Sequence, residues 1–94
     1  MRVITNRRLV EFALLYTDAG TPLQAWRKLM ESRSYRGFND LKMSLGSVDI
    51  VGDKHVFDIR GNRYRIVCGI SYATQLCFIK AVLTHSQYDE GKWK

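Results

Sequence analysis

The stretch from His55 to Tyr88, HVFDIRGNRYRIVCGISYATQLCFIKAVLTHSQY, predicts three consecutive strands followed by a short polar tail. Gly61-Asn62 lies between two runs in which apolar and polar residues alternate. Both residue types tolerate a positive φ, so this dipeptide is a strong short-range signal for a tight hairpin. A second, weaker turn is predicted at residues 71–74, because Ser71 and Thr74 favour turns. The chain is therefore expected to fold back on itself twice in this stretch.

The register of the sheet follows by counting outward from the two turns. With Gly61-Asn62 as the first loop, Ile59 faces Tyr64 and Phe57 faces Ile66. Directly opposed residues share a face, and successive pairs alternate between faces. With Tyr72-Ala73 as the second loop, the same count predicts that Cys68 faces Cys77, that Val67 faces Phe78 and that Arg65 faces Lys80.

One face of this sheet is predicted to be apolar and the other basic. The basic face carries Asp58 as its single acid, beside the cations Arg60, Arg63, Arg65 and Lys80. A polar, solvated face is ordinary in an antiparallel sheet, which is the simpler interpretation. The excess of cations nevertheless favours a surface that binds anions.

The composition is that of one small globular domain spanning residues 1–94. The chain is 46% hydrophobic and 26% charged, and its net charge of +6 favours polyanionic partners such as RNA, DNA or a ribosomal surface. An acidic protein that masks the basic face is an alternative partner. The sequence contains no apolar run of about 18 residues, the length that would predict a membrane span, and the N-terminus lacks a secretory signal. We therefore expect a cytoplasmic protein.

The first half of the chain predicts a strand and two amphipathic helices. The fold class is α+β, with the helical hairpin packed on the apolar face of an antiparallel sheet. Asn6 and Thr21 are the expected N-caps, the latter followed by Pro22 at the first helical position. The expected segments are a strand at 2–5, helices at 7–16 and 22–32, a turn starting at Asn39, and an extended segment at 47–51.

The two cysteines do not predict a metal site. Cys68 and Cys77 have no second pair, and only His55 and His85 could join them. A cross-strand disulfide is geometrically conceivable, but free thiols are favoured in a cytoplasmic protein. We expect neither a metal nor a cofactor.

The tail beyond the third strand predicts a single helical turn. Thr84 and Gln87 have the spacing of a capping box, which would fix His85 and Tyr88 just past the strand. The final Lys92-Trp93-Lys94 is either a frayed terminus or a phosphate contact with a stacking ring.

Four residues near this end match the needs of a ribonuclease that works without a metal. RNA carries its own nucleophile, the 2′-hydroxyl, so the enzyme must move protons and neutralise charge on the phosphate. Histidine changes charge near neutral pH, and Arg and Lys stabilise developing negative charge. Tyr88 could share the proton transfer or stack on a base. The candidate catalytic residues are Arg65, Lys80, His85 and Tyr88, although a lone His and Tyr can also be structural.

The segments 56–70 (VFDIRGNRYRIVCGI), 83–85 (LTH) and 86–89 (SQYD) resemble the HigB family of toxins, a branch of the RelE/ParE-like toxins. The resemblance implies a compact RelE-like fold and an mRNA interferase that cleaves translated message on the ribosome. It also implies neutralisation by a HigA-type helix-turn-helix antitoxin, through which the toxin reaches operator DNA only indirectly. RNA or ribosomal-RNA contacts are then expected at Lys42, Arg60, Arg63, Lys92 and Lys94.

Two other functions remain open on the sequence. A non-catalytic RNA- or ribosome-binding module would share the basic sheet and bind RNA without cleaving it. A gyrase-directed toxin of the same superfold would cause DNA damage rather than loss of message. An assay for mRNA cleavage separates both from the ribonuclease.

Overall fold

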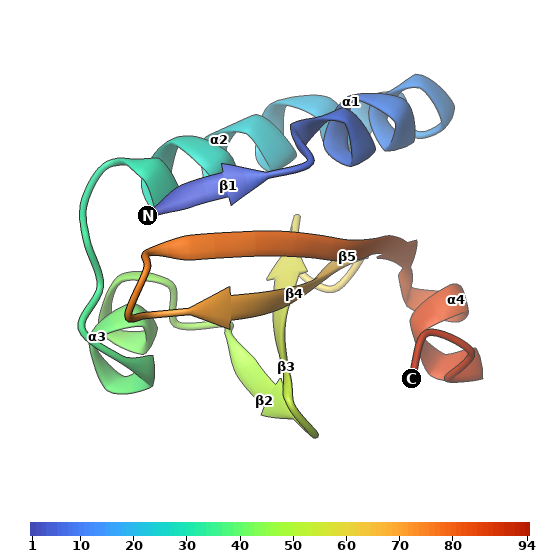
Figure 1. The fold of residues 1–94 in the computed structure, drawn as a ribbon. Helices are drawn as coiled ribbons and strands as arrows, with labels where there is room; N and C mark the ends of the chain where they lie inside the picture. The colour runs from blue at the N-terminus through green and yellow to red at the C-terminus, as the bar shows by residue number, and fades with distance from the viewer.

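The computed structural model describes all residues, 1–94, as a five-stranded sheet with two long helices on one side (Figure 1). The strands lie in the order β1-β5-β4-β3-β2. The short helices α3 and α4 lie at opposite ends of the sheet (Figure 1). The elements are β1 (Arg2–Ile4), α1 (Asn6–Leu15), the 3-10 helix η1 (Thr17–Ala19), α2 (Gly20–Glu31), α3 (Phe38–Ser44), β2 (Asp49–Val51), β3 (Lys54–Ile59), β4 (Tyr64–Ser71), β5 (Leu76–Thr84) and α4 (His85–Glu90).

The α+β class is confirmed, but the sheet is mixed rather than wholly antiparallel. Strand β1 pairs with β5 in parallel, with Val3 opposite Cys77, while all other neighbours are antiparallel. Strand β1 therefore joins the sheet at one edge, next to the last strand of the chain. No short-range signal could place it there, because the two strands lie far apart in the sequence.

The predicted register of the first hairpin is confirmed along its whole length. Strands β3 and β4 pair from Ile59 opposite Tyr64 to His55 opposite Cys68. The turn is closed by a hydrogen bond of 3.4 Å that the Arg63 amide donates to the Arg60 carbonyl. The residues with positive φ are Arg60 (53°) and Gly61 (64°), rather than Gly61 and Asn62 as expected.

The predicted register of the second hairpin is wrong. The loop has four residues, Tyr72 to Gln75, because pairing begins with Ser71 opposite Leu76. Gln75 adopts a positive φ of 57°, and its side-chain amide accepts a bond from the Tyr35 amide and donates one to the Tyr35 carbonyl, at 3.0 and 2.7 Å. A distant segment thus holds this turn in a shape that local turn preferences do not indicate.

A β-bulge then shifts the pairing a second time. Val67 faces Ala81 and Cys68 faces Ile79, which leaves Lys80 as the extra residue. A bulge puts two consecutive residues of one strand on the same side of a sheet. On β5, Cys77, Ile79 and Val82 therefore lie on the side of α1 and α2. The opposite side, which we call the outer face, carries Asp58 of β3, Arg65, Val67 and Gly69 of β4, and Phe78, Lys80, Ala81 and Leu83 of β5.

The longer loop and the bulge together separate two predicted catalytic residues. Arg65 lies opposite Leu83, not opposite Lys80. Cys68 and Cys77 are likewise not directly opposed, although both are buried free thiols in the core. Burial, together with a hydrogen bond to Cys77, raises the pKa of the Cys68 thiol well above its ordinary value.

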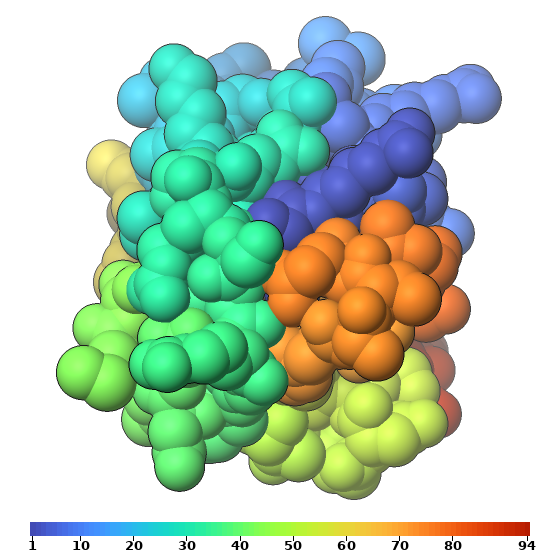
Figure 2. Space-filling view, turned by 60° about the vertical axis from the view of Figure 1, so that its left-hand side comes forward, coloured from blue at the N-terminus to red at the C-terminus, as the bar shows by residue number.

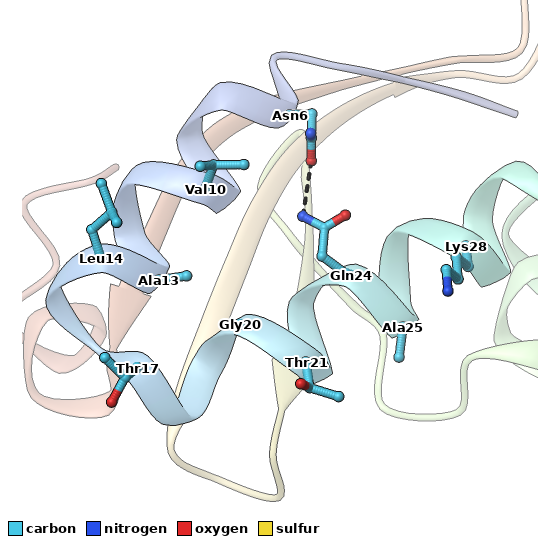
Figure 3. Close-up of a pocket in the computed structure, with 10 residues that line it drawn as sticks. All are labelled: Asn6, Val10, Ala13, Leu14, Thr17, Gly20, Thr21, Gln24, Ala25 and Lys28. Atoms are coloured by element: carbon cyan, nitrogen blue, oxygen red, sulfur yellow. Dashed lines mark hydrogen bonds between the residues drawn. The ribbon is translucent and has the colours of Figure 1, made fainter.

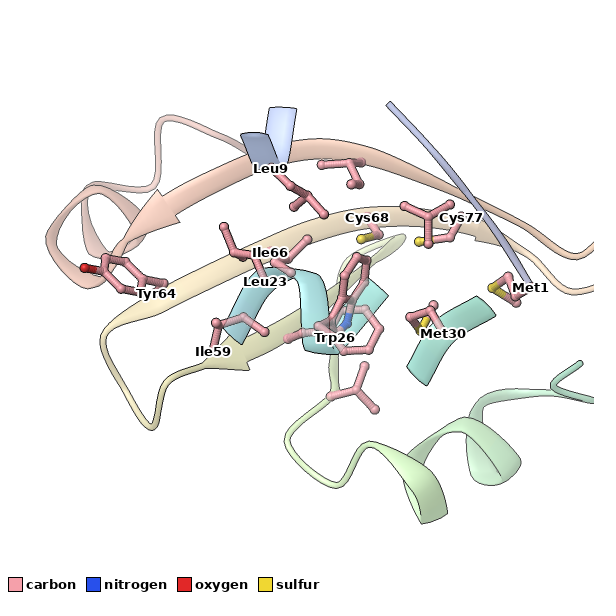
Figure 4. Close-up of a cluster of buried hydrophobic side chains, with 14 of the residues drawn as sticks. Met1, Leu9, Leu23, Trp26, Met30, Ile59, Tyr64, Ile66, Cys68 and Cys77 are labelled. Carbon is pink, nitrogen blue, oxygen red and sulfur yellow. The ribbon is translucent and has the colours of Figure 1, made fainter. Parts of the chain in front are cut away.

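The two long helices cover the inner face of the sheet with the stripes that the sequence predicts. Leu9 and Phe12 of α1 are buried, and so are Leu23, Trp26 and Met30 of α2. Figure 4 shows Trp26 among the side chains of this cluster. The centre of its ring lies 5.2 Å from that of the Phe57 ring, in an edge-on arrangement. Leu29 and Ile50 lie outside the core, with exposed fractions of 40% and 47%.

The helix starts differ from prediction in both cases. Asn6 is the first residue of α1 rather than its cap, and its side-chain oxygen accepts a hydrogen bond from Gln24 of α2 at 3.1 Å. Helix α2 begins at Gly20, directly after η1, so Thr21 lies inside the helix.

The predicted turn at Asn39 and the extended segment at 47–51 correspond to α3 and β2. None of the helices combines the length and the hydropathy that crossing a membrane would require.

Replacing the buried ring at the centre of the core should test this packing. Phe57→Ala should lower the free energy of unfolding by about 3–5 kcal/mol, because it leaves a cavity beneath Trp26. Leu14→Ala is the control, since Leu14 is 76% exposed on α1 and should change stability by less than about 0.5 kcal/mol. Urea unfolding of both variants measures the difference; equal losses would contradict the packing described.

Candidate functional site

The tip of the first hairpin and the start of α4 meet at one end of the sheet. The His85 amide donates a hydrogen bond of 2.9 Å to the Arg63 carbonyl. The predicted capping box is confirmed: Thr84 Oγ1 accepts from the Gln87 amide at 3.2 Å, and Gln87 Oε1 accepts from the Thr84 amide at 2.9 Å. Together these bonds fix the first turn of α4, and with it the predicted site residues His85 and Tyr88, against the end of β5.

His85 is the best-placed proton-transfer group of the chain. Its Nδ1 lies 2.8 Å from Oδ2 of Asp89, one turn along α4, and its side chain is 44% exposed. Because Asp89 engages Nδ1, Nε2 is the ring nitrogen left to exchange a proton with a substrate. The sequence-based reasoning missed Asp89, although its spacing of four residues from His85 on a predicted helix is a readable signal.

Arg65 is buried and serves as a support rather than a free cation. Its side chain is only 9% exposed, and its Nε lies 3.0 Å from Asp58 on the neighbouring strand. The guanidinium also donates to the backbone oxygens of Asn62 and Tyr64, at 3.1 and 3.2 Å, and to the Asn62 side chain. All three guanidinium nitrogens therefore bind groups of the protein itself.

Arg65 in turn supports the aromatic part of the site. Its guanidinium carbon lies 5.2 Å from the centre of the Tyr88 ring. The Trp93 ring stacks on Tyr88 at 5.0 Å, and Trp93 Nε1 donates to the Tyr88 carbonyl at 2.9 Å. Both partners contact the face of the tyrosine ring, so its hydroxyl is the part left for a substrate. Trp93 and Lys94, whose Nζ lies 5.8 Å from the indole centre, belong to this packed cluster rather than to a frayed end.

Arg60 and Arg63 do not share the outer face with Lys80, contrary to prediction. Both turn toward η1, where their guanidinium groups lie 2.6 and 2.9 Å from Oδ2 of Asp18. The other oxygen of Asp18 accepts a hydrogen bond from the Tyr64 hydroxyl. The sequence-based reasoning missed Asp18 entirely, because only the tertiary fold brings η1 to the hairpin.

The charges of this cluster shift two pKa values in opposite directions. The hydrogen bond from Tyr64 is the main cause that holds the pKa of Asp18 below its ordinary value, and Arg60 and Arg63 act in the same direction. The same bond raises the pKa of the Tyr64 hydroxyl. Asp18 therefore stays ionised, and Tyr64 stays protonated, across the neutral range.

A hollow of about 360 Å³ lies beside these groups and brings Arg63 and His85 together. It is lined by Tyr16, Asn62, Arg63, Tyr64, Thr84, His85 and Ser86. The other predicted cations lie elsewhere. Lys80 sits over the Phe78 ring on the outer face, at 5.7 Å, and Lys92 reaches Glu90 at 3.7 Å. Lys42 donates to the Val48 carbonyl from α3, at the other end of the sheet from α4 (Figure 1).

The largest hollow lies away from this chemistry, between α1 and α2 (Figure 3). It has a volume of about 690 Å³, and Lys28 is its only charged lining residue. The hydrogen bond between Asn6 and Gln24 crosses one end of it (Figure 3). It offers no group for acid–base work. Nor does the chain contain a cluster of three or more His, Cys, Asp or Glu side chains that could hold a metal ion.

Comparison with known proteins adds an independent line of information. A family model described as HigB_toxin, the RelE-like toxic component of a toxin-antitoxin system, matches residues 19–91. The mRNA interferase toxin HigB of Escherichia coli K12 is 33% identical over 92 residues, which cover 95% of this chain and 88% of that protein. The mRNA interferases HigB of Escherichia coli O157:H7 and Shigella flexneri match with the same identity and coverage.

The Asp18 cluster predicts a specific titration. Because the pKa of Asp18 is lowered in the folded chain, its ionisation stabilises the fold above the ordinary aspartate pKa of about 3.9. This contribution is lost as the pH falls through the lowered value. Tyr64→Phe removes the main cause and should move the Asp18 pKa back up. A carboxyl-carbon NMR titration of both proteins measures the shift; an unchanged Asp18 midpoint in Tyr64→Phe would show that the hydrogen bond is not its cause.

Proposed function

Because the chain belongs to the HigB family, the RelE-like toxic components of toxin–antitoxin systems, we propose that it is an endoribonuclease that cleaves mRNA at the α4 end of its sheet. The observation that carries this site is the pairing of His85 with Asp89 beside the hollow that Arg63 lines. An exposed histidine oriented by a carboxylate, next to a cation, is the arrangement that phosphodiester cleavage needs.

The proposed reaction uses the nucleophile that RNA carries. Nε2 of neutral His85 accepts the proton of the 2′-hydroxyl as that oxygen attacks the adjacent phosphorus. The bond from phosphorus to the 5′-oxygen breaks, and the leaving oxygen takes up a proton from water, while His85 returns the proton it accepted to the solvent. The products are a 2′,3′-cyclic phosphate and a 5′-hydroxyl, and no metal or redox step is required. Asp89 holds the imidazole in one tautomer and orientation.

The surrounding cations and Tyr88 have separate roles in this proposal. Arg63 lines the hollow and neutralises charge on the phosphate, while Arg65 holds Tyr88 with its hydroxyl available to donate to a phosphate oxygen. Lys80, with Arg60, Lys92 and Lys94, contacts the RNA backbone on either side. Lys42, at the far end of the sheet, fits a contact to ribosomal RNA rather than to the scissile bond.

The partners follow from the same premise. As the toxic component of a toxin–antitoxin system, the chain has an antitoxin partner. We propose that this partner is a HigA-type helix-turn-helix protein, through which the toxin is held at operator DNA, and that cleavage takes place on translated mRNA at the ribosome in the cytoplasm. The net charge of +6 supports both an RNA substrate and an acidic inhibitory surface.

Removing the histidine tests the catalytic assignment. His85→Ala should lower the rate of mRNA cleavage on the order of 10²-fold or more, because general acid–base catalysis contributes about that much. Primer extension on message from a translating extract, with and without ribosomes, measures cleavage and its dependence on ribosomes. Lys28→Ala is the control, because Lys28 is an exposed residue of α2 at the hollow between α1 and α2, and this variant should cleave mRNA at the wild-type rate. Wild-type rates in His85→Ala would remove this residue from the mechanism.

Arg65 should behave differently from His85. Arg65→Lys keeps the charge but loses the fork that binds Asp58, Asn62 and the Tyr64 carbonyl, so both cleavage and the free energy of unfolding should fall. His85→Ala should leave stability within about 1 kcal/mol of the wild type, because the side chain is exposed. Urea unfolding beside the cleavage assay separates the two effects. A fully stable but inactive Arg65→Lys would instead indicate direct contact with RNA.

A further inference from the structure

Phe78 is an aromatic ring on the outer face with no packing role in the core. It is 38% exposed and is the only aromatic residue among the exposed large hydrophobic side chains of the chain. Its neighbours on β5, Cys77 and Ile79, are buried on the other side of the strand. Figure 2 shows the orange residues at the start of β5 at the surface, between the dark-blue N-terminal strand and the yellow-green β2–β3 hairpin.

Strand β4 contributes no side chain of its own at the position directly beside Phe78. Residue Gly69 of β4 pairs directly with Phe78 and has no side chain to shield the ring. Lys80, two residues further along β5, lies on the same face by the ordinary alternation of a strand. Its aliphatic chain crosses above Gly69, with Cε 3.3 Å from where a β-carbon would lie. The Lys80 ammonium group reaches to 5.7 Å from the centre of the Phe78 ring.

This corner of the outer face carries a net positive charge. Lys80 makes no ion pair, and Lys54, at the start of β3, pairs with its exposed neighbour Asp53 at 3.0 Å. The hydrogen bond from Lys54 is the main cause that lowers the pKa of Asp53, and Lys80 lies near enough to this carboxylate to help lower it. One exposed aromatic ring with an adjacent ammonium group is too small an apolar surface for a protein partner, which buries a larger patch. It does match one nucleotide, because the ring stacks on a base and the cation meets a phosphate.

We propose that Phe78 and Lys80 form a base-stacking subsite, beside Gly69 of β4, for a single-stranded stretch of the RNA substrate. The proposal rests on the function proposed above and adds to it a second point of contact. A strand rises about 3.3 Å per residue, so the subsite lies roughly 20 Å along β5 from His85. The stacked base therefore belongs to a nucleotide several positions from the scissile bond. Between the two points the outer face of β5 presents Ala81 and Leu83.

The experiment measures binding of a short single-stranded RNA that cannot be cleaved because every 2′-oxygen is methylated. A series of such RNAs, each with one base removed, is titrated against purified protein by fluorescence anisotropy. For the wild type, loss of the stacked base should weaken binding by about five- to a hundredfold at one position. Phe78→Leu should weaken binding of the intact RNA by a similar factor. For this variant, removing the base at that position should cause no further loss of affinity. Phe78→Tyr keeps a flat ring and should restore the wild-type pattern.

Controls separate this subsite from the fold and from the active site. Leu14→Ala, on the opposite side of the molecule, should bind every RNA of the series as the wild type does. Lys80→Met should weaken all members of the series equally and flatten the salt dependence of binding. The melting temperatures of the Phe78 variants should match that of the wild type.

The proposal is overturned if the effect of changing Phe78 does not depend on which base the RNA lacks. If Phe78→Leu binds the intact RNA as tightly as the wild type, or loses affinity equally for all members of the series, Phe78 does not stack on a base. Loss of antitoxin binding in Phe78→Leu with unchanged RNA binding would assign the ring to the protein partner instead. Failure of His85→Ala to reduce cleavage would refute the proposed mechanism and leave this binding test unaffected.

Discussion

The hydrogen-bonded turn from Arg60 to Arg63 is the constraint on which the rest of the site depends. Three elements hold it: Asp18 of η1 binds its two arginines, Arg65 of β4 binds Asn62, and the His85 amide of α4 binds the Arg63 carbonyl. The tip of a two-stranded hairpin is ordinarily one of the more mobile parts of a protein. Here it is a junction, so the position of His85 relative to Arg63 is set by the backbone rather than by flexible side chains.

The cations of this chain divide into those that build the site and those that remain free. Arg65 is buried and its guanidinium nitrogens are engaged by the protein, so it acts by holding the hairpin and the Tyr88 ring. Arg60 and Arg63 are partly neutralised by Asp18. Lys80 makes no ion pair and lies on the outer face. An argument from charge alone would treat these residues as equivalent, whereas desolvation and pairing make them physically different.

The bulge at Lys80 changes more of the sheet than its single residue suggests. A side-chain period of two means that one inserted residue exchanges the faces of the remainder of a strand. Without it, Val82 would leave the core and Leu83 would face the helices. With it, Ala81 and Leu83 join Phe78 and Lys80 on the outer face, and Val82 turns inward to the side of α1, where it lines a hollow with Phe12 and Leu15. The outer face is therefore continuous from the start of β5 to α4.

The features that rest on local chemistry can be predicted from the order of the residues alone. The Gly61-Asn62 turn gave the β3–β4 register, the spacing of Thr84 and Gln87 gave the capping box, and helical periodicity gave the buried stripes of α1 and α2. Each depends on residues within one turn or one hairpin, where geometry leaves few alternatives. The family was also readable, from the order of residues 56–70 and 83–89.

The way in which these elements meet depends on contacts between residues far apart in the chain. The β4–β5 register depends on Gln75 binding Tyr35 forty positions away and on a bulge that no turn residue marks. The pairing of Asp18 with the hairpin arginines spans a similar distance, and the parallel addition of β1 to β5 joins the two halves of the chain. Such contacts form because packing brings distant groups together. Their energy depends on how deeply the groups are buried and how their hydrogen bonds are oriented, and neither can be read from the order of the residues. For that reason the sequence predicts Arg65 only as a cation of the candidate site, while the fold shows that groups of the protein itself engage its guanidinium.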